Sequence, residues 1–202
     1  MITEEILKTL EKEATENPHS VFAQHRLAIA YFNLGKFQEA KEAFKRVLKL
    51  DPFNFEAMVN LGILLAQEGE LEEAKKAFTF TLKYYPKSLE AWNNLGLIEF
   101  ELGNLEEAEK CYRKALELNE NFAEAWINLS TVLIEKGLFE EAIKALEKAK
   151  VYAPENAVIY NNLAVAYYYL KDKESALKNL NLAKELGYSV NPEFERMINE
   201  NL

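Results

Sequence analysis

Residues 91–96 read AWNNLG, and related hexapeptides occur at four other places in the chain. They are AQHRLA at 23–28, AMVNLG at 57–62, AWINLS at 125–130 and IYNNLA at 159–164. Each later copy begins 34 residues after the one before it. Because self-similarity at a fixed period of roughly 20–50 residues is the mark of a repeat architecture, the sequence predicts a protein built from tandem repeats.

Other residue types keep the same register, and together they predict that each repeat is a pair of helices. The recurring positions are Gly35, Gly69, Gly103 and Gly137; Ala40, Ala74, Ala108, Ala142 and Ala176; and Pro52, Pro86 and Pro154. In the unit 89–122, apolar residues follow at helical spacing up to Phe100, and Gly103 favours the left-handed turn that ends a helix. Ala108 and Tyr112 then belong to a second apolar stripe.

Polar residues at the predicted helix starts support these boundaries. Ser, Thr, Asn and Asp side chains accept hydrogen bonds from the first free N–H groups of a helix. The predicted caps of first helices are Ser20, Asn54, Ser88 and Asn156, with Asn121 beside Phe122 in the fourth unit. Asn104 is the predicted cap of the second helix of the third unit.

Composition and charge exclude several classes of protein. Seven Gly and five Pro among 202 residues, with abundant Ala, Leu, Glu and Lys, favour helix and one or two domains. A net charge of −9 disfavours nucleic acid, which requires a basic surface. No leader pattern and no apolar run long enough for a membrane span occur, so we expect a cytoplasmic protein. One cysteine, Cys111, and two histidines predict neither a disulfide nor a metal site.

The repeats resemble the tetratricopeptide family, whose pattern is Trp-x2-Leu-Gly-x2-Tyr, then Ala-x3-Phe, then Pro. The matching residues include Trp92, Leu95, Gly96, Ala108 and Tyr112; Leu61, Gly62, Ala74, Phe78 and Pro86; and Leu27, Tyr31, Ala40, Phe44 and Pro52. Departures are Glu99 in place of Tyr, Glu120 in place of Pro, Lys171 in place of Gly and Tyr188 in place of Pro, which we expect to loosen turns.

The resemblance implies an all-α solenoid, a right-handed superhelix of antiparallel helix pairs in one domain, 1–202. The expected repeats are 21–54, 55–88, 89–122, 123–156 and 157–190. Residues 1–18 are the expected N-terminal flanking helix, and residues 191–202 the expected C-terminal capping helix. In the remaining chemistry we find no catalytic constellation and predict no enzyme and no cofactor. Paired carboxylates such as Glu72 and Glu73 suit the first turn of a helix, where they oppose its dipole.

The resemblance also implies where a partner binds, because first helices of such arrays line a concave groove. The candidate groove residues are His25, Arg26, Asn60, Asn93, Asn94, Asn128, Asn161, Asn162, Phe22, Ile63, Leu97 and Tyr168. Tyr169 is expected to face the same way as Tyr168. Four of the asparagines, Asn60, Asn94, Asn128 and Asn162, recur once per repeat, and an amide both donates and accepts, as a peptide backbone requires. We call them the asparagine ladder.

The charge of the groove selects among ligands. The family's clamp for chaperone carboxylate tails needs Lys and Asn where this chain has His25 and Ile29. It also needs Lys and Arg where this chain has Glu90 and Asn94, so that clamp is absent. We therefore predict a protein or peptide partner that is apolar and neutral to basic, with Arg26 available to an acidic ligand residue. Two alternatives stay open: a module for self-assembly into homo-oligomers, and the substrate-recruiting arm of a larger enzyme complex.

Overall fold

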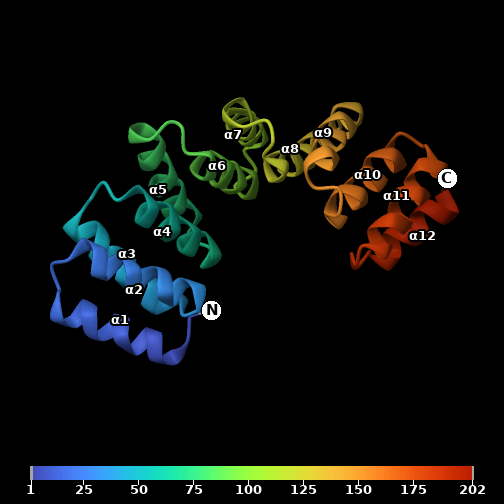
Figure 1. Cartoon of the computed structure of the whole chain (residues 1–202). Coiled ribbons are helices and arrows are strands. Elements are labelled where there is room, and N and C mark those ends of the chain that lie inside the picture. Colours follow the sequence, from blue (N-terminus) through green and yellow to red (C-terminus); the bar gives the residue numbers. More distant parts are fainter. Residues whose placement is uncertain (1, 202) are drawn as a thin grey trace. The chain divides into compact units, whose positions relative to one another are not determined.

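The computed structural model describes residues 2–201, and all regular structure within that range is helical. The helices are α1 (Glu4–Glu16), α2 (Val21–Asn33), α3 (Phe37–Leu50), α4 (Phe55–Gln67), α5 (Leu71–Tyr84), α6 (Leu89–Glu101), α7 (Leu105–Leu118), α8 (Ala123–Glu135), α9 (Phe139–Tyr152), α10 (Ala157–Tyr169), α11 (Lys173–Glu185) and α12 (Pro192–Asn201) (Figure 1). The predicted all-α solenoid of helix pairs is confirmed.

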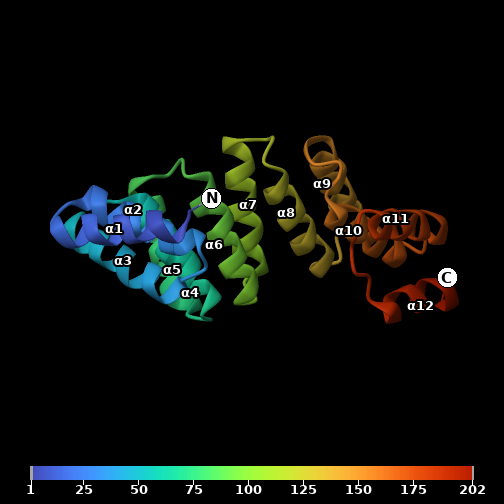
Figure 2. The same cartoon turned by 60° about the horizontal axis from the view of Figure 1, so that its bottom comes forward.

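The chain divides into two compact units, the first ending at Ile98 and the second beginning at Glu99. In the first unit α1 packs on α2, α2 on α3, α3 on α4, and α4 on α5. In the second, α7 packs on α8, α8 on α9, α9 on α10, and α10 on α11 (Figure 2). Helix follows helix in the order that the 34-residue period predicts. The expectation of one domain over 1–202 stays a prediction.

The recurring alanines lie in the core of the helix pairs. All five of them, Ala40, Ala74, Ala108, Ala142 and Ala176, are fully buried. Four residues further on, each helix buries a large side chain: Phe44, Phe78, Tyr112, Leu146 and Leu180. At Gly62 a Cβ atom would lie 2.8 Å from the ring of Phe78, so the ring occupies the space that a larger residue at position 62 would need.

The turns within the helix pairs share one backbone conformation. Gly35, Gly69, Gly103 and Gly137 have φ of 71°, 79°, 80° and 74°. Lys171, the residue at this position in the fifth repeat, has φ 62°. The expectation that Lys171 loosens its turn is wrong, because the Asp172 N–H still donates to the Tyr167 carbonyl oxygen at 3.0 Å. Packing of α10 on α11 holds a non-glycine residue in a conformation that it adopts rarely.

The predicted caps of the first helices are confirmed at four positions. The side chains of Ser20, Asn54, Ser88 and Asn156 accept hydrogen bonds from the N–H groups of Ala23, Ala57, Ala91 and Val158 at 3.0 to 3.2 Å. The prediction for Asn104 is wrong, because its side-chain nitrogen donates instead to the buried carboxylate of Glu99 at 2.8 Å. Phe122 precedes α8 without any side-chain cap.

Helices α1 and α12 lie in the segments expected to flank the repeats, and each packs on its own unit. Helix α1 buries Leu7, Leu10 and Ala14 against Leu27 and Ala30 of α2. Helix α12 starts at Pro192, after Asn191 accepts a hydrogen bond from the Glu193 N–H at 2.8 Å. It buries Ile198 against Ala164, Ala176 and Leu180.

Candidate peptide-binding site

A pocket of about 440 Å³ opens in the first unit beside the starts of α4 and α6. Three segments line it: Phe55, Glu56, Val59, Asn60 and Ile63 from α4, Tyr85 and Ser88 from the loop between α5 and α6, and Glu90 and Asn94 from α6. Three of the predicted groove residues, Asn60, Ile63 and Asn94, therefore line one pocket. We call this pocket the α4–α6 pocket.

The two asparagines of the pocket retain hydrogen-bonding capacity. The Asn60 side-chain nitrogen donates to the Glu56 carbonyl oxygen at 3.0 Å, which leaves its second N–H and its oxygen available. The Asn94 side chain forms no hydrogen bond with any residue in the range 2–201. Both side chains are partly exposed. Together they can satisfy N–H and C=O groups of an extended backbone.

The carboxylates of the pocket lack strong cationic partners. Glu56 lies 3.6 Å from the Nε2 atom of His25. Glu90 accepts a hydrogen bond of 3.4 Å from the Ser88 hydroxyl. Across residues 2–201 neither carboxylate has a lysine or arginine nitrogen within 4.0 Å, and neither residue type lines the pocket. The pocket therefore carries uncompensated negative charge.

Five aromatic side chains continue outward from the pocket. The ring centres of Phe55 and Tyr85 lie 4.6 Å apart. The Phe55 ring centre also lies 6.4 Å from that of Phe53 and 6.5 Å from that of Tyr84. Phe80 contacts Phe53 at 6.1 Å and Tyr84 at 4.9 Å. Phe53, Tyr84 and Tyr85 are 53%, 44% and 56% exposed. We call these five residues the aromatic patch.

The repeat pattern does not reveal the aromatic patch, but departures from that pattern do. The position of Phe53 is occupied in the other repeats by Lys87, Asn121, Glu155 and Ser189. The position of Phe80 is occupied by Arg46, Lys114, Lys148 and Leu182, and that of Tyr85 by Asp51, Asn119, Ala153 and Gly187. These aromatics stand at positions where the residue type differs from that of the other repeats, so they do not belong to the repeat pattern.

Arg26, one of the predicted groove residues, is already engaged within the protein. Its guanidinium donates to both carboxylate oxygens of Glu13 on α1, at 2.9 and 3.1 Å, and lies 5.3 Å from the Phe22 ring centre. We therefore do not keep Arg26 as a partner for an acidic ligand residue. Phe22 itself is 68% exposed. His25 packs edge-on against Phe44 at 6.2 Å, and its buried Nε2 atom has no hydrogen-bond partner.

Helix α6 presents its two other candidates differently. Asn93, predicted to face the groove, is only 3% exposed and interacts within the protein. It is therefore not available to a ligand at the surface. Leu97 is partly exposed, one turn after Asn93. Of the adjacent asparagines 93 and 94, only Asn94 faces the α4–α6 pocket.

The candidates of the second unit are largely engaged with one another. Asn161 donates to the Asn162 side-chain oxygen at 3.3 Å, and Asn162 donates to the Thr131 hydroxyl at 3.3 Å. Asn128 interacts within the protein as well. The two tyrosines expected to turn to the groove both make ring contacts with neighbouring helices. Tyr168 contacts Phe194 of α12 at 5.7 Å, and Tyr169 stacks on Phe139 of α9 at 4.8 Å.

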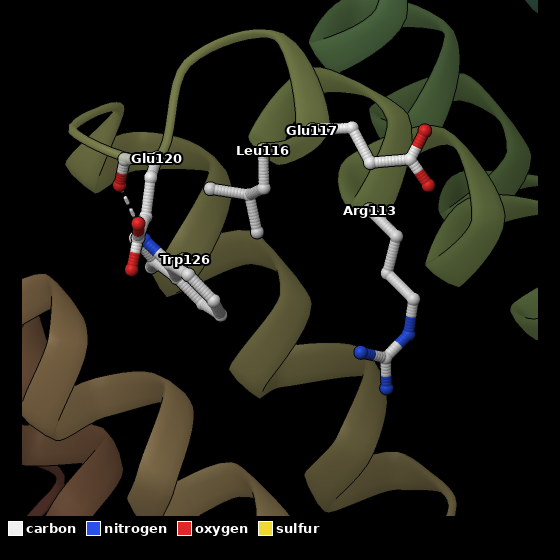
Figure 3. Close-up of a pocket in the computed structure, with 5 residues that line it drawn as sticks. All are labelled: Arg113, Leu116, Glu117, Glu120 and Trp126. Carbon is white, nitrogen blue, oxygen red and sulfur yellow. Dashed lines mark hydrogen bonds between the residues drawn. The ribbon is translucent and has the colours of Figure 1, made fainter.

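A pocket of about 430 Å³ in the second unit lies between α7 and α8, where Arg113, Leu116, Glu117, Glu120 and Trp126 surround it (Figure 3). The Trp126 indole N–H donates to the Glu120 carbonyl oxygen at 2.8 Å. The same ring-to-loop bond recurs one repeat away in both directions, from Trp92 to Pro86 at 2.9 Å and from Tyr160 to Pro154 at 2.7 Å. This hydrogen bond is therefore part of the repeat fold, and it leaves the Trp126 indole N–H unavailable to a ligand.

Perturbed titratable groups do not converge on either pocket. Burial raises the pKa of Tyr31 to about 12, and the hydrogen bond to Glu11 adds to the rise. Burial also raises the pKa of Tyr112. Within residues 2–201, His, Cys, Asp and Glu side chains form no group of three that could hold a metal ion. No helix in the same range is long and apolar enough to cross a membrane.

Paired helices with a buried alanine, a glycine turn and a 34-residue period define the chain as a tetratricopeptide-repeat protein. More particularly, residues 2–186 match the family model of the cilia and flagella-associated protein 70 C-terminal domain, and the chain belongs to that tetratricopeptide family. No curated protein matches the sequence significantly.

Solved structures share the fold. One of MamA is 28% identical with a TM-score of 0.71 and covers 79% of this chain and 94% of its own. YrrB, described as a tetratricopeptide-repeat protein with an unusual peptide-binding site, is 23% identical, with a TM-score of 0.71 and coverage of 90% and 93%. PilF of Pseudomonas aeruginosa is 21% identical, with a TM-score of 0.82 and coverage of 98% and 89%.

Proposed function

We propose that the protein is a non-catalytic interaction module that binds an extended peptide segment of a partner protein, with the α4–α6 pocket as the centre of the site. Proteins of this repeat family serve generally as scaffolds for protein interaction. The observation that carries the proposal is the position of Asn60 and Asn94, two rungs of the asparagine ladder, in one pocket with unused hydrogen-bonding capacity.

We expect the spacing of the two rungs to suit an extended backbone. Helices that pack directly lie roughly 8–10 Å apart, and an extended chain advances about 3.3 Å per residue, so one asparagine would serve about every third residue. Ile63 and Val59 supply apolar contact between the polar groups. YrrB, whose likeness to this chain establishes the fold alone, illustrates that an array of similar length can carry a peptide site.

The experiment is a screen of a random peptide library against the wild-type protein, followed by affinity measurements on the peptides selected. We expect Asn60→Ala/Asn94→Ala to weaken binding roughly tenfold or more, because two polar groups of the bound backbone lose their partners. Asn128→Ala/Asn162→Ala, at the equivalent positions of the second unit, is the matched control and should change affinity little. Peptides that bind both variants as they bind the wild type would contradict the proposed site.

A further inference from the structure

We propose that the α4–α6 pocket and the aromatic patch form a two-part recognition site for a lysine or arginine side chain followed by an apolar residue in the partner peptide. The cationic group would enter the pocket between Glu56 and Glu90, and the apolar residue would lie on the aromatic patch. This inference rests on the proposed function and adds the chemistry that selects the ligand.

The negative charge of the pocket is complementary to a cationic side chain. Glu56 and Glu90 lie on its lining, and no lysine or arginine compensates them from any described part of the chain. The chain as a whole carries a net charge of −9. A lysine or arginine of a partner would remove the unfavourable proximity of two carboxylates and would form charge-assisted hydrogen bonds with them.

The second argument is the position of the rings. Phe55 and Tyr85 line the pocket together with the two carboxylates, and ring faces attract cations. The Lys83 ammonium already lies 5.3 Å from the centre of the Tyr84 ring, so the outer end of the patch accepts a cation within this protein. Because that outer end is occupied, an incoming cation is favoured at the inner end, where the carboxylates are.

The third argument is that the repeat fold does not require the patch. Three of its five positions, 53, 80 and 85, hold polar, charged or small residues in most of the other repeats. Helix pairs form equally well there: α8 packs on α9 with Asn121, Lys148 and Ala153 at the equivalent positions. Exposed aromatics that folding does not require mark an interaction surface.

The other repeats also provide substitutions that keep the fold. The patch variant Phe53→Asn/Phe80→Lys/Tyr85→Asn introduces the residue types of positions 121, 148 and 119. The charge variant is Glu56→Gln/Glu90→Gln. Matched controls are Tyr152→Leu, an exposed tyrosine at the position equivalent to Tyr84, and Glu174→Gln/Glu185→Gln on α11. Circular dichroism and chemical denaturation establish that each variant is folded.

The test begins with peptides selected from the random library on the wild-type protein, labelled for fluorescence anisotropy. We expect selected sequences to contain a Lys or Arg beside an apolar residue. The patch variant and the charge variant should each weaken binding about tenfold, and the controls should not. Replacing the basic residue of the peptide by Gln should weaken wild-type binding by the same factor and should cause no further loss in the charge variant.

Two results would overturn the inference and leave the proposed function intact. One is a set of selected peptides without enrichment in Lys or Arg. The other is an affinity that falls in Asn60→Ala/Asn94→Ala but not in the charge and patch variants. If no peptide binds the wild type, the proposed function fails as well. Light scattering could instead show a dimer that the patch variant abolishes. That result would assign the patch to a second copy of the chain and would contradict its role in peptide binding.

Discussion

The aromatic patch of the first unit and the equivalent positions of the second unit lie on the same kind of helix pair but carry different side chains. Where the first unit has Phe53 and Phe80, the second has Asn121 and Lys148. The Lys148 ammonium forms an ion pair of 2.7 Å with Glu120, so this surface is internally neutralised. Residues that build the helix pair recur in both units, whereas residues that distinguish their surfaces do not. We therefore propose that Asn60 and Asn94, which keep the repeat, bind the peptide backbone, and that the aromatic patch, which breaks it, selects the ligand.

The largest effect should come from a buried aromatic of the repeat. Phe78→Ala removes a side chain that is 1% exposed and leaves a cavity, and we expect a loss of about 3–5 kcal/mol in the free energy of unfolding. Phe53→Asn, which changes an exposed aromatic of the patch, should alter it by about 0.5 kcal/mol or less. Chemical denaturation followed by circular dichroism measures both. Similar losses for the two variants would mean that the fold does require the patch.

The next effect concerns the close approach of α4 and α5. Gly62→Ala places a methyl group 2.8 Å from the Phe78 ring, and we expect a loss of about 1–3 kcal/mol despite the higher helix propensity of alanine. Phe78→Leu, the residue type found at positions 146 and 180, should relieve the crowding. In a double-mutant cycle by chemical denaturation, the combined loss should be smaller than the sum of the single losses. Strict additivity would contradict the steric explanation.

The ring-to-loop hydrogen bond should be of equal value in both units. Trp92→Phe in the first unit and Trp126→Phe in the second each remove one indole donor that bonds a loop carbonyl oxygen. We expect each to cost about 0.5–1.5 kcal/mol in thermal or chemical unfolding. Tyr160→Phe, which removes a hydroxyl donor to Pro154, should fall in the same range. A large cost in one unit only would show that this bond is not a shared element of the repeat.

The smallest effect should be the pH dependence of an ion pair between helices. The hydrogen bond from Lys136 holds the pKa of Glu109 below its ordinary value of 4.5, and Arg113 adds to the lowering. The folded state therefore binds this proton less readily than the unfolded state. The resulting stability, about 1 kcal/mol or less, is present above pH 4.5 and is lost as the pH falls through the lowered pKa.

Glu109→Gln removes that contribution, so its stability should depend less on pH below 4.5 than that of the wild type. Denaturation at a series of pH values measures the difference. Lys41 lowers the pKa of Glu68 in the first unit in the same way, and Glu68→Gln is the matched variant. An acid dependence unchanged by Glu109→Gln would show that the pair contributes nothing to folding.

Most of the fold was predictable from the sequence because its determinants are local and repeated. The period, the glycine turns and four of the helix caps were read directly, since each depends on a few neighbouring residues. Asn104 was misassigned because the buried Glu99 carboxylate, which the repeat pattern does not contain, competes for its side chain. Lys171 was misjudged because packing of α10 on α11 overrides its backbone preference.

The site was less predictable because it depends on contacts between repeats. The repeat register made Asn60, Asn94 and Ile63 groove candidates, and all three line one pocket. It could not show that Glu13, on the flanking helix α1, engages Arg26, or that Phe194, on the closing helix α12, packs against Tyr168. Nor could it reveal that rings 27 or more residues apart, such as Phe53 and Phe80, form one surface.

The most direct test of the central claim is a map of amide chemical shifts in isotope-labelled protein, recorded with and without a peptide selected from the library. We predict that the changes concentrate on Phe55, Glu56, Asn60, Tyr85 and Asn94 in the first unit. The equivalent positions of the second unit, such as Ala123 and Asn128, should show little change. Changes spread evenly along the asparagine ladder, or confined to the second unit, would contradict the proposal that the α4–α6 pocket is the centre of the binding site.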